Sequence, residues 1–141
     1  MPKILLNVFA TVCFCALGTV VIAFAWHVLA PNPPVTNGST EYICRFLYAG
    51  VPRRWQSALA FVLWAAAAGH FTRTGMHWIV AGFVLPYAVA LFYEIKTTPT
   101  SHNLFPFEIV LFWGPLAIAA VVGGALGRFL VRRLRPQFNT A

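Results

Sequence analysis

The 141-residue chain is 60% hydrophobic and 16% aromatic, and only 9% of its residues are charged. Soluble domains carry about 25% charged residues, so this composition excludes an ordinary soluble domain. The formal charge of +7 comes from basic residues placed in ones and twos at the ends of apolar stretches. Anionic lipid headgroups lie at that level, so the charge favours the membrane surface over nucleic acid as its partner.

The first apolar stretch predicts a transmembrane helix over residues 4–30. A spanning helix needs about 20 mostly apolar residues, and this run exceeds the core of about 7–15 residues of a signal peptide. We therefore expect an uncleaved helix. Cys13 and Cys15 point about 200° apart on it and cannot bond to each other. With Cys44 alone in the following segment, the cysteines predict no disulfide framework.

Residues 31–54 form the only sizeable predicted loop, because they begin with the turn-forming run PNPPVTNGST. Two more transmembrane helices are predicted over residues 55–71 and 76–95. The short turn between them predicts an antiparallel hairpin. Pro86 lies inside the second of these helices, where membrane bundles tolerate a proline if neighbouring groups satisfy the freed carbonyl.

The fourth predicted helix, over residues 105–131, carries small residues at every fourth position: Ala119, Gly123 and Gly127. Such a stripe lets a second helix approach closely, so it predicts a helix-packing face. Its partner is either another helix of the chain or another subunit. The sequence thus predicts an all-α fold, a single transmembrane domain over residues 1–141 formed by a bundle of four transmembrane helices.

The basic residues predict the orientation of this bundle. With four spans, one side of the membrane holds Lys3, Arg73, Arg128, Arg132, Arg133 and Arg135. The opposite side holds Arg45, Arg53, Arg54 and Lys96. The larger group predicts that both termini are cytoplasmic. Together with the simple loops, it predicts a bacterial inner membrane.

Two imidazoles and two carboxylates gather at the predicted outer boundary: His27, Glu94, His102 and Glu108. This set would suit a divalent metal or a proton relay. The alternative is that the carboxylates pair with basic residues at headgroup level and cap helix ends. Glu108 falls in the first helical turn, where the helix dipole favours an anion. No His pair at metal-binding spacing occurs on one helix, so the sequence assigns no metal.

His70 and His77 flank the turn at the predicted cytoplasmic end. Ala66, four residues before His70, leaves room for a flat macrocycle bound through the imidazole. Over these five residues the chain resembles the Ala-x-x-x-His pattern of bacterial light-harvesting polypeptides, which implies a pigment ligand at His70. His70 and His77 are together the candidate haem or pigment ligands. The alternative is interfacial histidines bonded to headgroups or to the turn. The sequence leaves the cofactor open.

No nucleophile elbow, phosphate loop, C-x-x-C or H-E-x-x-H motif occurs in the chain. The sequence therefore favours a small accessory or scaffolding subunit of a larger membrane complex. Its expected partners are the lipid bilayer and either other membrane subunits or copies of itself. The alternative is a membrane protein with its own metal, haem or proton-handling site. A transporter or channel is disfavoured because no charge lies in the middle of a predicted span.

Overall fold

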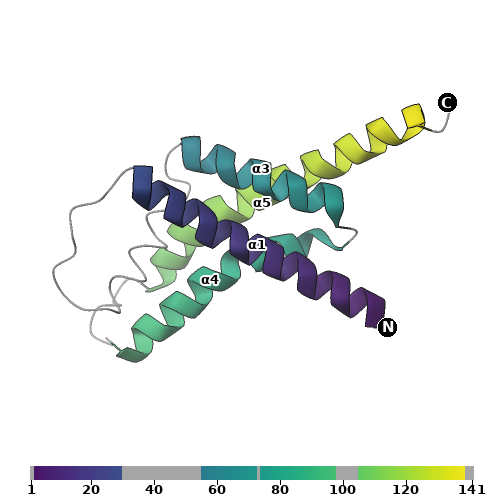
Figure 1. Ribbon diagram of the computed structural model, residues 1–141. Helices are drawn as coiled ribbons and strands as arrows, with labels where there is room; N and C mark the ends of the chain where they lie inside the picture. The colour runs from purple at the N-terminus through teal and green to yellow at the C-terminus, as the bar shows by residue number, and fades with distance from the viewer. Residues whose placement is uncertain (1, 30–54, 73, 98–104, 139–141) are drawn as a thin grey trace.

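The computed structural model describes residues 2–29, 55–72, 74–97 and 105–138. These residues form four helices and no strands (Figure 1): α1 (Pro2–Leu29), α3 (Trp55–Phe71), α4 (Met76–Thr97) and α5 (Phe105–Phe138). An all-helical fold is confirmed for this part of the chain. Helices α4 and α5 extend past their predicted ends at residues 95 and 131, and the predicted loop 31–54 lies outside the described residues.

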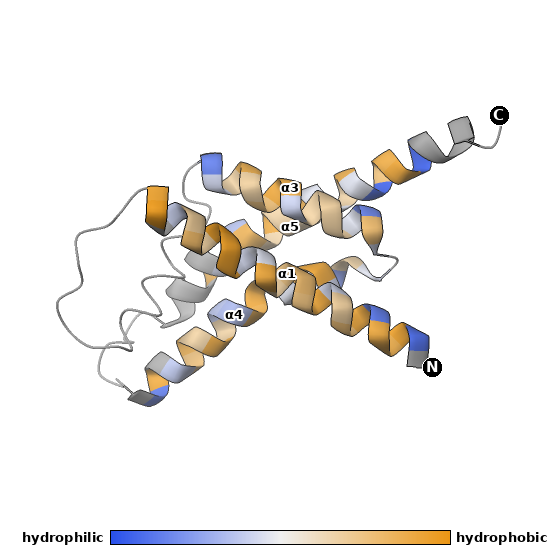
Figure 2. Ribbon diagram, viewed as in Figure 1, coloured by the Kyte–Doolittle hydropathy of each residue, from blue (hydrophilic) through white to orange (hydrophobic). Residues whose placement is uncertain are grey.

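Three of the helices are long and apolar enough to cross a membrane, with candidate spans at Lys3–Trp26, Met76–Tyr93 and Trp113–Arg133. Helix α3 has 17 residues and is not among them. Apolar residues dominate the middle of each helix in Figure 2, and polar residues gather at the ends. The described helices are therefore compatible with an integral membrane protein.

The helices pack as a ring in the order α1, α4, α5, α3. The most extensive contacts join α3 to α5, and the next join α1 to α4. Helices α3 and α4 contact each other little, although only a short turn separates them in sequence. Each of the two helices in the predicted hairpin therefore packs chiefly on another helix.

Glycines explain this choice of partners, because they let backbones approach where a side chain would hold them apart. A Cβ added to Gly69 of α3 would meet the backbone of Gly124 in α5. Between α4 and α1, a Cβ at Gly82 would lie 2.6 Å from the Cβ of Cys15 and 2.9 Å from the Val12 carbonyl oxygen. Helices α3 and α4 have no comparable glycine contact with each other among the described residues.

Small side chains face inward on α1, and large ones face outward. The buried face of this helix consists of Thr11, Cys15, Gly18, Thr19, Ile22 and Ala23. Its exposed face includes Leu5, Phe9, Leu17, Val21, Phe24 and Val28. Water would favour the reverse arrangement, because burial of large apolar side chains drives folding there. Lipid removes that drive and favours small residues between helices.

Larger side chains fill only the centre of the ring. Phe61 of α3 meets Phe83 of α4 edge to face, with ring centroids 5.6 Å apart. Ile79, Tyr87 and Leu116 are fully buried around this pair. The bundle is therefore close-packed at its centre, and the polar features of the described chain lie between helices or at the ends.

Candidate functional site

The cluster predicted at the outer boundary cannot be assembled from the described side chains. His27 lies in the last turn of α1, Glu94 in the last turn of α4 and Glu108 in the first turn of α5. Their side chains, and the whole of His102, lie outside the described residues. The metal and proton-relay interpretations of this cluster stay predictions.

Among the side chains that the structure does describe, no three His, Cys, Asp or Glu residues come close enough to hold a metal ion. Cys13 is exposed and Cys15 is buried, and neither forms a disulfide. The two thiols lie on different sides of α1, as their spacing on a helix requires. The described side chains therefore contain no cluster of metal ligands.

His70 and His77 lie at the other end of the bundle, on either side of the turn between α3 and α4. Both side chains are exposed. The ring of His70 contacts Phe71, with centroids 4.9 Å apart, and the ring of His77 contacts Trp78 at 5.1 Å. Ala66, the small residue expected to leave room for a macrocycle beside His70, has its backbone carbonyl group against α5. A haem or pigment role for the two histidines stays a prediction.

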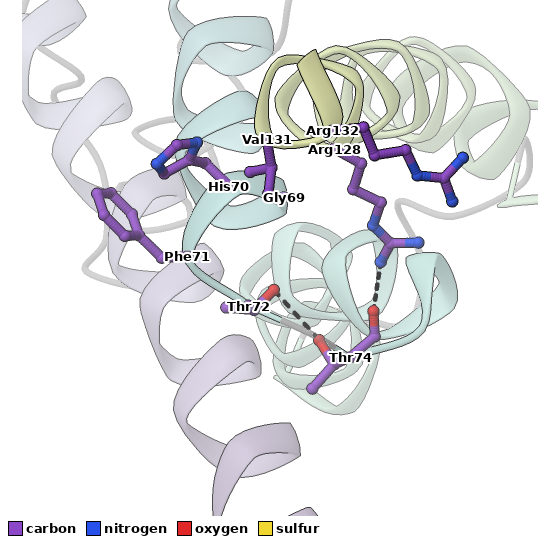
Figure 3. Close-up of a pocket in the computed structure, with 8 residues that line it drawn as sticks. All are labelled: Gly69, His70, Phe71, Thr72, Thr74, Arg128, Val131 and Arg132. Carbon is purple, nitrogen blue, oxygen red and sulfur yellow. Dashed lines mark hydrogen bonds between the residues drawn. The ribbon is translucent and has the colours of Figure 1, made fainter. Parts of the chain in front are cut away.

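Thr74, in the turn between α3 and α4, links three helices at this end. Its hydroxyl lies 3.0 Å from the hydroxyl of Thr11 in α1, and it donates to the hydroxyl of Thr72 at 3.3 Å. Arg128 of α5 donates to the carbonyl oxygen of Thr74 (Figure 3). Thr74 is buried, so these bonds satisfy polar groups that would otherwise be costly to remove from water.

An open cleft of about 640 Å³ surrounds this turn. It is lined by Gly69, His70, Phe71, Thr72, Thr74, Arg128, Val131 and Arg132. A second cavity of about 410 Å³ shares Phe71 and Thr72 with it and reaches α1 at Asn7 and Ala10. No acidic residue lines either cavity within the described part of the chain, so the charge of the cleft is positive.

Two further hydrogen bonds join neighbouring helices, one at the edge of the bundle and one in its buried interior. Trp64 of α3 donates its Nε1–H to the carbonyl oxygen of Phe14 in α1 at 3.1 Å, and its ring stacks on Phe14 and lies over Gly18. Thr19 of α1 donates to the carbonyl oxygen of Phe83 in α4 at 3.1 Å. These polar side chains bind backbone groups of a neighbouring helix, so their role is to hold helices together.

The small residues of α5 lie against α3. A Cβ added to Gly123 would meet the Val62 carbonyl and lie 2.7 Å from the Cβ of Ala65. A Cβ added to Gly127 would meet the carbonyl group of Ala66, and Ala119, one turn before Gly123, is buried. The sequence left the partner of this face open between the chain itself and another subunit. In the structure that partner is α3.

The patterns weighed from the sequence did not single out Thr74, Arg128 or Trp64. A signal for Thr74 was present, because Thr72 and Thr74 place two hydroxyl groups in one short turn. Arg128 had been assigned to the lipid surface together with the other basic residues of the C-terminal segment. Nothing in the local sequence indicates that its side chain reaches back to the turn.

Comparison of the chain with protein-family models, with curated proteins and with solved structures gave no match.

Proposed function

We propose that this protein is an integral membrane protein that acts as an accessory or scaffolding subunit of a larger membrane complex. The observation that carries the proposal is that polar side chains between the helices bind backbone groups of neighbouring helices. Thr19 in the buried interior and Trp64 at the edge of the bundle bind backbone groups of neighbouring helices, while large apolar side chains cover the outside. Such a molecule has surface for other membrane helices and little interior room for a reaction.

Helix α3 is the fourth span in this proposal. Its 17 residues extend about 26 Å at a rise of 1.5 Å each, slightly less than the roughly 30 Å of a bilayer core. Local thinning and polar end residues accommodate a mismatch of this size at modest cost. Trp55 and Gln56 at one end and His70 at the other are exposed, as expected of residues at a membrane boundary.

Both termini lie on the cytoplasmic side in this proposal, in a bacterial inner membrane. Four spans bring the start of α1 and the end of α5 to the same side. The exposed basic residues Lys3, Arg132 and Arg133 support the cytoplasmic assignment, because positive charge accumulates on that side. The cleft beside Thr74 then opens at the cytoplasmic boundary.

Photo-crosslinking in native membranes tests the subunit role. We would place benzoylphenylalanine at one outward position on each of three helices: Phe24, Leu63 and Ile118, which are 61%, 59% and 66% exposed. A subunit should give a protein adduct of defined mass from at least one face. The remaining faces should give lipid adducts only.

Lipid adducts at every position, together with a purified particle containing one chain, would refute the subunit role. Adducts only with copies of the chain would also refute it, since they would indicate a homo-oligomer. A site of the protein's own would then become the leading explanation, and His70 would be the first described residue to substitute.

A further inference from the structure

The cleft beside Thr74 has a fixed place relative to the candidate span of α5. That span ends at Arg133, so the cleft-lining residues Arg128, Val131 and Arg132 lie in its last turns. Beyond them α5 continues to Phe138 and projects past the end of α3 (Figure 1). The cleft therefore lies where α5 leaves the hydrocarbon core, at the level of lipid phosphate groups.

Arg128 is held in position over this cleft. Its guanidinium donates to the Thr74 carbonyl oxygen, which lies in a turn that Thr11 also contacts. A guanidinium has five N–H donors, and the bond to Thr74 uses one of them. The bond therefore orients the side chain and leaves donors for a ligand, so less conformational entropy is lost on binding.

Arg132 lies one helical turn after Arg128 and lines the same cleft. In Figure 3 the two side chains extend to the same side of the cleft, whereas the His70 ring points to the other side. Like charges at this spacing on a helix repel and destabilise each other. Because no acidic residue of the described chain lines the cleft, an anion from outside would relieve this repulsion.

We propose that the cleft binds the phosphate group of an anionic membrane lipid through Arg128 and Arg132. Arginine donors match phosphate oxygens in a fork geometry. The membrane level of the site favours a lipid over a soluble phosphate compound. The exposed side chain of Phe71, which lines the cleft, offers an apolar contact to its acyl chains. The proposal rests on α5 crossing the membrane and not on the subunit role.

Native mass spectrometry of the purified full chain in a neutral detergent tests this proposal. The chain would be titrated with dioleoyl phosphatidylglycerol and, in parallel, with dioleoyl phosphatidylcholine. Arg132→Gln is the test variant, since Arg132 is exposed and its loss should not disturb folding. Arg133→Gln is the matched control, because it removes the same charge one residue away. Arg133 lies over the Phe129 ring at 5.2 Å and does not line the cleft.

We expect phosphatidylglycerol to bind more tightly than phosphatidylcholine. We also expect Arg132→Gln to weaken its binding about tenfold, as follows from roughly 1.5 kcal/mol for a hydrogen bond to a charged group. Arg133→Gln should change binding less than twofold. Equal losses in the two variants would overturn the proposal, since they would indicate general surface charge. Full displacement by millimolar inorganic phosphate would also overturn it and would assign the cleft to a soluble phosphate compound.

Discussion

Gly127→Ala tests the contact between α3 and α5 that organises the bundle. The new Cβ would meet the carbonyl oxygen of Ala66 and would lie 2.8 Å from its carbonyl carbon and 3.0 Å from its Cα. All three atoms belong to the backbone of a helix, so none of them can rotate away. The side chain can be accommodated only if the two helices move apart.

The size of this effect follows from the distances. Carbon atoms in good contact lie about 3.5–4.0 Å apart, so the carbonyl carbon alone requires α3 and α5 to separate by at least roughly 0.7 Å at this point. Overpacking typically costs about 1–3 kcal/mol, and the rigid neighbours of Gly127 favour the upper end. Alanine recovers about 0.5–1 kcal/mol because glycine is a poor helix former. The expected net loss in the free energy of unfolding is about 2 kcal/mol.

The assay is unfolding in mixed micelles of dodecyl sulfate and a neutral detergent, followed by tryptophan fluorescence. Ala125→Leu is the control, since Ala125 lies on the exposed face of α5 two residues before Gly127. Its larger side chain should change stability by less than about 0.5 kcal/mol. Gly127→Ala as stable as the unmodified protein, or Ala125→Leu as damaging as Gly127→Ala, would refute the predicted close contact of α3 with α5.

Three further predictions concern other parts of the bundle. Gly18→Ala should lower the free energy of unfolding, because the new Cβ would lie 2.5 Å from Cδ1 of Trp64. In a Trp64→Ala background this loss should be smaller by about 1 kcal/mol. Additive losses in this double-mutant cycle would contradict the contact. A second double-mutant cycle with Thr11→Val and Thr74→Val should give a coupling free energy of about 0.6 kcal/mol, which is typical of hydrogen bonds between membrane helices. A coupling free energy of zero would exclude a stabilising hydrogen bond between the two hydroxyl groups. If both termini are cytoplasmic, green fluorescent protein fused to the C-terminus should fluoresce, and alkaline phosphatase fused there should be inactive. The opposite result would invert the proposed orientation.

The sequence predicted the helices well because hydropathy is averaged over many adjacent residues. The observed α3 begins and ends where the apolar run 55–71 does. The end of α5 was placed too early, since the prediction stopped where the apolar residues stop. The structure continues that helix through the basic segment to Phe138. Arginine is a good helix former, so loss of apolar character does not by itself end a helix.

The candidate site was less accessible to sequence reasoning, because its residues are far apart in the chain. Thr74 contacts Thr11, 63 residues earlier, and Arg128, 54 residues later. Neither relation follows from a periodic pattern. The sequence places Arg128 at the membrane boundary, but it does not predict the hydrogen bond from Arg128 to the turn.

The sequence by itself determined that the chain is helical and apolar enough for a membrane, and that small residues line one face of α5. Each of these properties belongs to a single segment, so each can be read from that segment alone. Only the tertiary structure decided that α5 packs on α3 and α1 on α4, and that a basic cleft forms at the turn between α3 and α4. These choices depend on where a glycine of one helix meets the backbone or a small side chain of another, because backbones come close only where little side chain lies between them.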